Sequence, residues 1–508
     1  MKILTAAQTR EADAQTITNE NIASVDLMER AALAFTCWFE NKFLPRQSVY
    51  IFAGPGNNGG DGLAVARLLH ERSYPVKVFV IGDLTNASQD FQINHDRLPA
   101  AIAATPIVSI ADFPSIPERA LVIDALFGTG LSRPVTGLFA EVIGKMNNSK
   151  VCVISIDVPS GLYTDKQTPS EGAIIRATHT VSFELPKLAF FLPQHEQYVG
   201  AWHTVPIGLS PKYIAEAKTD HYFTTLEDVQ QLLKPRRKFS HKGLYGHALL
   251  LCGSLGKMGA AVLAARACLR SGVGLLTVHA PSVGYSILQT AVPEAMTLSD
   301  PNRRVLSKLP DQMDKYSVVG AGPGIGTERQ TKTVIGQLLA TTSLPLVLDA
   351  DAINLVGSSD RLKAQLPRNR VIFTPHPKEF ERLVGKSKDD YDRLENMREF
   401  CREYACYMVL KGSHSAICTP EGEVYFNTTG NPGMATGGTG DVLTGIVTAL
   451  VAQNYTLKEA CLLGVYLHGL AGDLARETVG EISLIASDLI EQLPKAFRRL
   501  APHQDLAR

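Results

Sequence analysis

A glycine-rich stretch near the end of the chain, Asn431 to Gly445, combines residue types that could carry out phosphoryl transfer. Its centre is Gly437-Gly438-Thr439-Gly440-Asp441, followed by an apolar run at helical spacing. A glycine-rich turn that leads into a helix leaves backbone N–H groups unpaired, and such groups bind phosphate. Asp441 would repel that anion, so its carboxylate is expected to act as a base on a hydroxyl held beside the phosphates. The alternative is that Asp441 caps the helix in a solvated turn.

A second glycine-rich stretch, Gly54 to Gly62, lies in the first half of the chain and contains Gly56-Asn57-Asn58-Gly59-Gly60-Asp61. An apolar strand is expected before it at 49–53, and a helix after it at 63–71. Many α/β proteins bind phosphates with this order of strand, glycine loop and helix. The spacing matches neither a Walker A loop nor a Rossmann GxGxxG motif. The stretch therefore indicates a different kind of anion site, with a purely structural tight turn as the alternative.

Two more polar loops follow expected strands of the first half. Asp124 ends the strand expected at 121–124 and leads to the loop Gly128 to Pro134, while Asp157 follows the strand expected at 151–156 and precedes Ser160. Ligands of open α/β sheets bind beyond the carboxyl ends of the strands, so we expect these loops to converge on one site. Asp157 taken alone could instead be a helix cap or a turn residue.

The second half also places polar groups at the ends of expected strands. His376 lies between two prolines in a rigid turn, which favours a ligand contact over core packing. Asp349 and Asp351 follow the strand expected at 346–349 and could equally cap the next helix. Lys411 stands beside a glycine turn, from which its ammonium could reach a diphosphate.

The elements that must position these residues alternate between strand and helix. A helical segment at 8–42 and a basic, solvated linker at 234–242 flank the first set of strands, and the domain boundary is expected near 215–225. The alternation predicts two α/β units, each with a mostly parallel sheet. Further strands are expected at 76–81, 246–253, 275–279, 317–320 and 371–374, a short helix near 225–233 and a hairpin at 417–426.

Composition limits the function classes. The chain has 508 residues, 45% of them hydrophobic, which suits two or three domains. Lys plus Arg and Asp plus Glu are equal at 50 each, so neither nucleic acid nor a membrane surface is expected as the main partner. No apolar run reaches the ~18 residues of a membrane helix, and the first residues lack a signal-peptide core. The eight cysteines show no metal-ligand spacing. We expect a cytoplasmic protein.

The three polar motifs of the first half resemble the signature loops of the NAD(P)H-hydrate epimerases. The resemblance covers most of residues 1 to about 215. It implies that Asp157 lies beside the reacting ring and that K⁺ lies against Asn58, Asp124 and Ser160, whose oxygens are hard ligands. It further implies that Asp157 and two loops bind the hydrated dinucleotide, the loops being Asn57, Asn58, Gly59, Gly60 and Asp61, and Gly128, Thr129, Gly130, Leu131, Ser132, Arg133 and Pro134.

Residues 221–501 resemble the ADP/ATP-dependent NAD(P)H-hydrate dehydratases, a branch of the ribokinase-like superfamily. The resemblance is carried by the stretches 246–267, 320–326, 374–380, 411–415 and 431–445. It implies that Ala260, Gly324, His376 and Asp441 contact the hydrated dinucleotide and that ADP, with Mg²⁺, is the co-substrate. The residues implied to bind the nucleotide are Lys411, Gly412, Ser413, His414, Ser415 and Gly440.

The two resemblances together predict an α/β protein of two domains. Residues 1–218 would form a Rossmann-like three-layer sandwich, and residues 219–508 a ribokinase-like three-layer α/β/α domain. The implied function is repair of NADHX and NADPHX, the hydrates of NADH and NADPH. The first domain would interconvert the R and S hydrates, and the second would dehydrate the S form using ADP, releasing AMP and phosphate. The resemblance also suggests a homo-oligomer.

Two other functions fit the same motifs. The second half could be an ordinary small-molecule kinase, because the fold and Asp441 belong to a whole superfamily. The first half could be a non-catalytic binding or scaffold module. The carboxylates Asp61, Asp124 and Asp157 argue against the second alternative.

Overall fold

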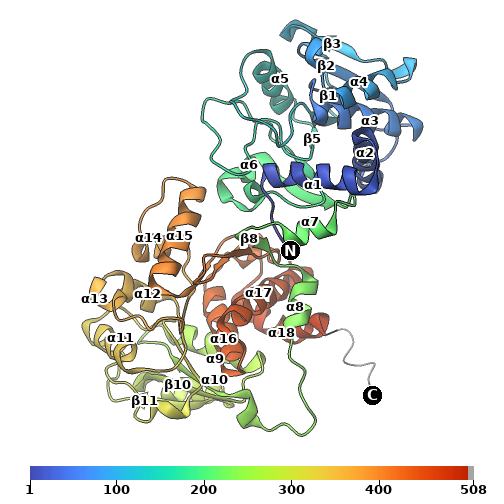
Figure 1. Ribbon diagram of the computed structural model, residues 1–508. Helices are drawn as coiled ribbons and strands as arrows, with labels where there is room; N and C mark the ends of the chain where they lie inside the picture. The colour runs from blue at the N-terminus through green and yellow to red at the C-terminus, as the bar shows by residue number, and fades with distance from the viewer. Residues whose placement is uncertain (502–508) are drawn as a thin grey trace. The chain divides into compact units, whose positions relative to one another are not determined.

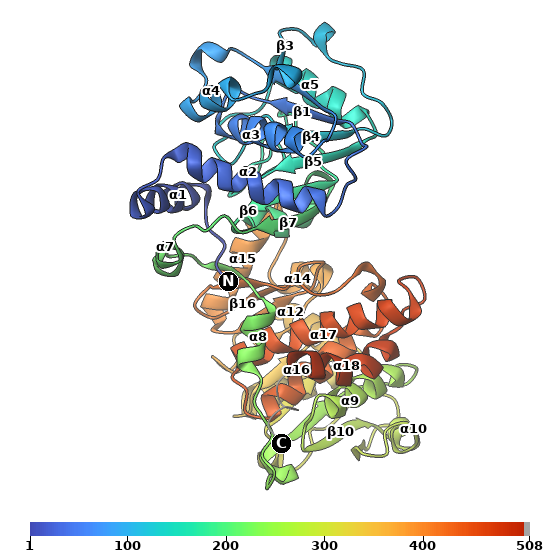
Figure 2. The ribbon, with the colours of Figure 1, turned by 90° about the vertical axis from the view of Figure 1, so that its right-hand side faces the viewer.

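The computed structural model describes residues 1–501, which form two compact units (Figures 1 and 2). One unit comprises residues 2–219, and the other comprises Met1 and the residues from Asp220 onward. No helix among residues 1–501 is both long enough and apolar enough to cross a membrane.

The unit of residues 2–219 is built on a seven-stranded parallel sheet of order β3-β2-β1-β4-β5-β6-β7. The chain builds outward from β1 to β3 on one side and from β4 to β7 on the other. The order therefore reverses between β1 and β4, where open α/β sheets bind ligands. The strands are β1 (Val49–Ala53), β2 (Val76–Ile81), β3 (Thr105–Ile107), β4 (Leu121–Ala125), β5 (Cys152–Ile156), β6 (His179–Phe183) and β7 (Ala201–Val205).

Helices cover both faces of this sheet, as Figure 1 shows for α5 on one side and α2, α3 and α4 on the other. Successive strand residues point to opposite faces, so Ile51 packs in one core with α2 and α3, and Phe52 in a second core with α5. The unit is thus a three-layer sandwich. Its helices are α1 (Ala6–Glu20), α2 (Ser24–Glu40), α3 (Asn57–Glu71), α4 (Gln89–Asp96), α5 (Gly137–Asn148), α6 (Glu196–Val199) and α7 (Pro211–Glu216).

The second unit has a ten-stranded sheet of order β11-β10-β9-β12-β13-β14-β15-β16-β17-β8. All neighbouring pairs are parallel except those of β16 with β15 and β17. The strands are β8 (His221–Phe223), β9 (His247–Leu251), β10 (Leu275–Pro281), β11 (Met296–Asp300), β12 (Val318–Ala321), β13 (Leu346–Leu348), β14 (Val371–Phe373), β15 (Tyr407–Leu410), β16 (Ala416–Cys418) and β17 (Val424–Phe426).

Helices lie on both faces of the second sheet, with α11 to α15 on one side and α9, α16, α17 and α18 on the other (Figure 1). The second unit is therefore also a three-layer α/β/α sandwich. The helices are α8 (Leu226–Leu232), α9 (Met258–Arg270), α10 (Tyr285–Ala291), α11 (Arg329–Thr341), α12 (Ala350–Gly357), α13 (Asp360–Lys363), α14 (Pro377–Leu383), α15 (Asp390–Tyr404), α16 (Thr439–Ala452), α17 (Leu457–Val479) and α18 (Ala486–Leu500).

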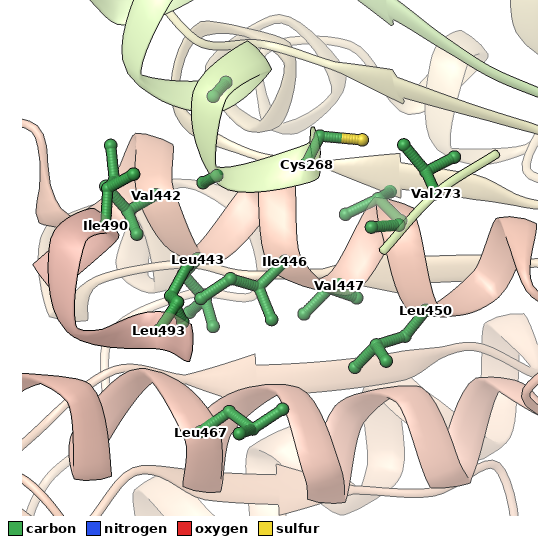
Figure 3. Close-up of a cluster of buried hydrophobic side chains, with 14 of the residues drawn as sticks. Cys268, Val273, Val442, Leu443, Ile446, Val447, Leu450, Leu467, Ile490 and Leu493 are labelled. Atoms are coloured by element: carbon green, nitrogen blue, oxygen red, sulfur yellow. The ribbon is translucent and has the colours of Figure 1, made fainter. Parts of the chain in front are cut away.

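Helix α16, which begins at the glycine-rich stretch, is enclosed by other helices. Figure 3 shows Leu443, Ile446 and Leu450 of α16 facing Leu467 of α17 and Leu493 of α18. Every residue of α16 from Val442 to Ala452 is buried. Close packing on all sides fixes the position of the helix, and with it the groups at its N-terminus.

The expected elements compare closely with the observed ones. The strands at 49–53 and 76–81 and the hairpin at 417–426 are confirmed. The helical segment expected at 8–42 is confirmed as two helices, because Asn21 adopts a left-handed φ of 52° and separates α1 from α2. The helix expected at 63–71 begins earlier, at Asn57, because the glycine stretch itself forms its first turns. The basic segment 234–242 contains no α-helix and belongs to the second unit, where the Lys234 backbone N–H donates to the Tyr455 hydroxyl.

Candidate active sites

The unit of residues 2–219 contains a cavity of about 800 Å³ at the point where the strand order reverses. Loops after β1, β4 and β5 converge on it, as expected from the sequence. Residues of helices α1 and α2 also line it, and the sequence did not point to these helices. Of the residues predicted to bind the substrate, those that line the cavity are Asn57, Asn58, Asp61, Gly128, Thr129, Gly130, Leu131, Ser132, Arg133 and Asp157.

Three residues predicted for this site do not line the cavity: Gly59, Gly60 and Pro134. A Cβ atom on Gly59 would lie 1.7 Å from the carbonyl oxygen of Gly54, so this glycine allows α3 to start directly against the end of β1. Gly60 lies against the Met28 side chain of α2. Both glycines therefore allow the close packing of α3 next to the cavity without lining it.

Asp157 has an unusual backbone and a crowded side chain. Its φ is +63°, a left-handed conformation that is uncommon for a non-glycine residue and recurs at functional sites. Its Oδ1 accepts hydrogen bonds from the Ser182 hydroxyl (3.0 Å) and the Phe183 backbone N–H (3.2 Å). The ammonium of Lys187, a residue only 1% exposed, lies 3.3 Å from the same oxygen. No described group donates to Oδ2, and the side chain lines the cavity.

A buried polar cluster surrounds Asp124 at the end of β4. Asp124 is 0% exposed and accepts hydrogen bonds from the hydroxyls of Ser155 (2.7 Å) and Ser160 (2.6 Å). Burial raises the pKa of Asp124 above its ordinary value, and these hydrogen bonds oppose the shift. The side-chain nitrogen of Asn58 is buried without a partner among the described residues. Neutral oxygens around one buried carboxylate are a donor set suited to an alkali cation.

Asp13 on α1 faces the same cavity, and sequence reasoning missed it. Burial and the charge of Asp157 raise the pKa of Asp13 to about 6, and Lys187 opposes the shift. The same two influences raise the pKa of the half-buried Asp61 well above its ordinary value. Helix α1 buries only Ala12 and Thr16, so it has no apolar stripe that would have marked which face of the helix turns inward.

In the second unit, Lys411 is held at the start of the turn that follows β15. Its ammonium lies 2.9 Å from Oδ1 of Asp349 and 4.0 Å from Oε2 of Glu379. The Thr444 hydroxyl of α16 donates to the other oxygen of Asp349 at 2.8 Å. Asp349 is the N-cap residue of α12 but makes no capping hydrogen bond, so its carboxylate instead joins β15 to α16. The sequence offered capping for Asp349, and it gave Glu379 and Thr444 no role of their own, although both lie within stretches that carry the resemblance.

Asp441 is the third residue of α16. The N-cap is Gly438, with φ +96°, so the alternative in which Asp441 caps the helix is wrong. Burial and the charge of Asp349 raise the pKa of Asp441 to about 7, and Lys411 opposes the shift. The first backbone N–H groups of an α-helix have no partner within the helix, so the start of α16 combines free N–H donors with a carboxylate that exchanges its proton near neutral pH.

The residues predicted to bind nucleotide lie around Lys411 and the start of α16. A Cβ atom on Gly440 would lie 3.2 Å from the Lys411 nitrogen. Ser413, His414 and Ser415 form the turn that connects β15 to β16, where the Gly412 backbone N–H donates to the Ser415 hydroxyl at 3.3 Å. The structure thus brings Gly440 and the turn that begins at Lys411 to one place.

The residues predicted to bind the hydrated dinucleotide lie at the starts of α9 and α16, at the N-cap of α14 and in the loop after β12. A Cβ atom on Gly324 would lie 3.2 Å from the Cβ of Ala260, so the loop after β12 meets the start of α9. Asp351 accepts a hydrogen bond from the Gly326 backbone N–H at 2.8 Å, and its charge contributes to the raised pKa of Asp441. His376 is the N-cap of α14, and its Nε2 lies 3.3 Å from Oε1 of Glu379.

These contacts link the groups into one candidate site. Glu379 connects His376 to Lys411, and Asp349 connects Lys411 to α16. Among residues 1–501, no group of three or more His, Cys, Asp or Glu side chains is placed to hold a metal ion.

Known proteins with similar sequences carry both units. A family model described as NAD(P)H-hydrate dehydratase matches residues 248–495, and one described as YjeF-related protein N-terminus matches residues 24–189. A bifunctional NAD(P)H-hydrate repair enzyme of Moorella thermoacetica is 36% identical over 98% of this chain and 97% of its own length. The corresponding enzyme of Escherichia coli is 32% identical over 88% of this chain and 84% of its own length.

A solved structure also resembles part of the chain. It is the ADP/ATP-dependent NAD(P)H-hydrate dehydratase from Bacillus subtilis, co-crystallised with ATP and Mg²⁺. It is 31% identical, covers 55% of this chain and 98% of its own, and superposes with a TM-score of 0.47.

Proposed function

Because the chain belongs to the family of bifunctional NAD(P)H-hydrate repair enzymes, we propose that its two units divide the two activities between them. The protein repairs hydrated NADH and NADPH: it epimerises the R and S hydrates and dehydrates the S form at the expense of ADP. Residues 1–218 carry the epimerase, and residues 219–508 carry the dehydratase. The observation that best supports this division is that each unit has its own polar site with its own candidate catalytic carboxylate, Asp157 and Asp441.

Asp441 is the base of the dehydratase. Its pKa of about 7 lets it accept a proton from the C6 hydroxyl of the hydrate at neutral pH. The hydroxyl oxygen then attacks the terminal phosphate of ADP, and AMP leaves. Phosphate departs from C6 with its bonding electrons, pushed by the lone pair of the ring nitrogen. Loss of a proton from C5 then restores NADH or NADPH.

Lys411 and the start of α16 stabilise the phosphoryl group during transfer. The unpaired N–H groups of the first helical turn donate to its oxygens. The ammonium of Lys411, 2.9 Å from Asp349, lies close to Gly440 and can exchange a carboxylate partner for a phosphate oxygen. Mg²⁺ supplies further charge neutralisation when it enters with the nucleotide.

Asp157 transfers protons in the epimerase. Protonation of the C6 hydroxyl lets it leave as water, and the ring nitrogen forms a flat iminium that water can attack from either face. Oδ2 of Asp157, which accepts no hydrogen bond from described groups, is the oxygen available for this transfer. The hydrated dinucleotide is bound by the two loops that line the cavity, Asn57–Asp61 and Gly128–Pro134.

Asn58, Asp124 and Ser160 would hold K⁺ in the epimerase unit. The buried carboxylate of Asp124 and the buried, unpartnered side-chain nitrogen of Asn58 support this proposal, since the amide oxygen of Asn58 can turn toward a cation. When bound, K⁺ neutralises Asp124 and fixes the two loops. Exchanging K⁺ for tetramethylammonium should slow epimerisation and lower the melting temperature of this unit. An unchanged epimerisation rate and melting temperature would contradict the proposed K⁺ site.

The assay that tests the function follows the absorbance of reduced nicotinamide with a mixture of R- and S-NADHX, ADP and Mg²⁺. Complete recovery of NADH with one phosphate released per NADH is the expected result. Recovery of NADH that stops at the amount of S-NADHX supplied would support the dehydratase activity and contradict the epimerase activity. A phosphorylated product without NADH would favour the small-molecule kinase. Sedimentation would test the homo-oligomer expected from the resemblance.

A further inference from the structure

Epimerisation through a flat iminium requires proton transfer on both faces of the ring. The hydroxyl leaves from one face as water, and a new water enters from the other face and loses a proton there. A carboxylate fixed on one side reaches only its own face, because general acid–base catalysis requires hydrogen-bond distance to the reacting oxygen. Asp157 is held by its backbone conformation and by the contacts of Oδ1 with Ser182, Phe183 and Lys187. Asp157 can therefore transfer protons on only one face of the ring.

A second carboxylate, Asp13, faces the same cavity from a different element. Asp13 comes from α1, whereas Asp157 follows β5 in the sheet. No described group donates a hydrogen bond to Asp13, and no Lys or Arg forms an ion pair with it within residues 1–501. Its carboxyl group is therefore available to a substrate. Its pKa of about 6 allows both protonation states near neutral pH, as an acid–base group requires.

Other charged groups around the cavity have different surroundings. Lys187 forms an ion pair with Asp157, and Asp90 accepts a hydrogen bond from the Ser24 hydroxyl at 2.5 Å. Asp61 lies in the first turn of α3, within the loop expected to bind the dinucleotide. The charged groups that face Asp13 from the elements around the cavity are Arg10, Asp61, Asp90, Arg133, Asp157 and Lys187.

We propose that Asp13 is a second catalytic residue of the epimerase, the acid–base group for the ring face opposite Asp157. The proposal rests on the epimerase function proposed above for this unit. In one direction the Asp13 carboxylic acid gives its proton to the C6 hydroxyl, the C6–O bond breaks, and water leaves while the nitrogen lone pair forms the iminium. Water then forms a new bond to C6 on the opposite face and gives a proton to the Asp157 carboxylate. Cavity water returns that proton to Asp13, and the reverse reaction exchanges the two roles.

The test uses the full-length protein with purified R- and S-NADHX, with and without ADP and Mg²⁺, in water enriched in ¹⁸O. The Asp13→Asn variant should lose epimerisation by about 100-fold or more, since general acid–base catalysis contributes roughly 10²–10⁴-fold. Dehydration of the S hydrate should keep its wild-type rate. Asp157 still serves its own face in this variant, so one of the two hydrates should continue to exchange its C6 oxygen with solvent without inversion. Asp157→Asn should retain exchange in the other hydrate.

Two controls separate chemistry from folding. Glu11→Gln changes an exposed carboxylate on the same helix, bonded to Tyr213 and outside the cavity, and should leave epimerisation unchanged. Both tryptophans of the chain, Trp38 and Trp202, lie in this unit, so their fluorescence reports its folding in the full-length protein. If Asp13→Asn unfolds the unit, Asp13→Ala with added formate replaces it, and formate should restore part of the epimerisation rate.

Three results would overturn the proposal while the epimerase function stands. One is epimerisation within about twofold of wild type in Asp13→Asn, which is below the range for acid–base catalysis. Another is loss of oxygen exchange in both hydrates by a folded Asp13→Asn protein, which would indicate a positioning role. The third is an Asp13→Ala protein that formate does not rescue. If the wild-type protein fails to convert the R hydrate, the proposed epimerase function itself is wrong.

Discussion

The two candidate catalytic carboxylates, Asp157 and Asp441, are each close to a lysine, but the lysines are placed differently. Lys187 is 1% exposed and lies 3.3 Å from Asp157 itself. Lys411 is bound not to Asp441 but to Asp349, at 2.9 Å, and it is more exposed. The difference suits the two reactions. Epimerisation adds and removes water at C6, and no anion reacts there. Lys187 can therefore stay paired with Asp157 throughout the reaction. Phosphoryl transfer requires a cation that can turn to the phosphate.

The two carboxylates also sit on different backbones. Asp441 lies in the first turn of a helix packed on all sides, among unpaired N–H groups that favour phosphate. Asp157 lies at the end of a parallel strand in a left-handed conformation that turns the chain toward the cavity. In one unit the helix terminus supplies much of the site, and in the other the strand ends supply it. Matched substitutions in the two units should therefore have different effects.

The largest effect is expected from the paired variants Asp441→Asn and Asp157→Asn. Each should lower its own activity on the order of 10³-fold and leave the other unchanged, because each removes one proton-transferring group. Asn is chosen at position 157 because it tolerates the left-handed backbone. Separate rate measurements on R- and S-NADHX check both. A variant that lowers both activities would show that the sites depend on one another.

The lysines provide the next comparison. Lys187→Met leaves the partly buried Asp157 carboxylate without its cation, which costs at most about 3–5 kcal/mol, so the unit of residues 2–219 should melt earlier. Lys411→Met also takes the cation from the buried Asp349, but Lys411 is itself partly exposed and Thr444 still donates to Asp349, so a smaller loss of stability is expected. Dehydratase kcat/KM should fall by about 100-fold, through loss of transition-state stabilisation. Calorimetric melts, which report the unfolding of both units, and ADP-dependent rates distinguish the two. Equal destabilisation by both substitutions would contradict the different roles assigned to the lysines.

The two glycine stretches should respond unequally to a methyl group. In Gly59→Ala the Cβ would lie 1.7 Å from the backbone oxygen of Gly54, which cannot move without shifting β1 or α3. A loss of about 3 kcal/mol in the free energy of unfolding is expected, as for other overpacked sites. In Gly440→Ala the nearest atom is the flexible end of Lys411, at 3.2 Å, so stability should change by less than about 1 kcal/mol. Equal losses would show that Gly440 is also fixed by packing.

The pH dependence of the dehydratase tests the state of Asp441. A base must be ionised, so kcat/KM should rise with pH and level off above about 7, the pKa of Asp441. The contribution of Asp441 to stability changes with pH in the opposite direction. The folded pKa lies above the ordinary value of 3.8, so the favourable contribution is complete below that value and is lost as pH rises through about 7. Asp441→Asn should therefore be more stable than wild type at pH 8, with a difference that shrinks toward pH 4. Parallel melting curves at both pH values would argue against the raised pKa.

The sequence predicted most of the framework because its signals are local. Strands such as Val49–Ala53 are short apolar runs between turn residues, and the glycine stretches mark where chain and helix meet. The motifs at strand ends also predicted which loops converge, because parallel strands present their carboxyl ends at one edge.

What escaped prediction depends on contacts distant in sequence. Asp349 meets Lys411 and Thr444 across 62 and 95 residues, and nothing near Asp349 distinguishes this role from capping. Asp13 enters the cavity only because α1 packs beside the sheet, and its own helix has no pattern that fixes its orientation. Edge strands such as Thr105–Ile107 are short and partly exposed, so they lack the apolar run that marked the central strands.

The central claim is that one chain carries two separate sites that act on a common, diffusible substrate. The most direct test mixes full-length Asp157→Asn with full-length Asp441→Asn and supplies R- and S-NADHX, ADP and Mg²⁺. Alone, the first variant should restore only the S fraction to NADH, and the second should restore none. The mixture should reach complete recovery, since one protein supplies the epimerase and the other the dehydratase, at a rate above that of an enzyme-free control. A mixture that stops at the S fraction would contradict the claim.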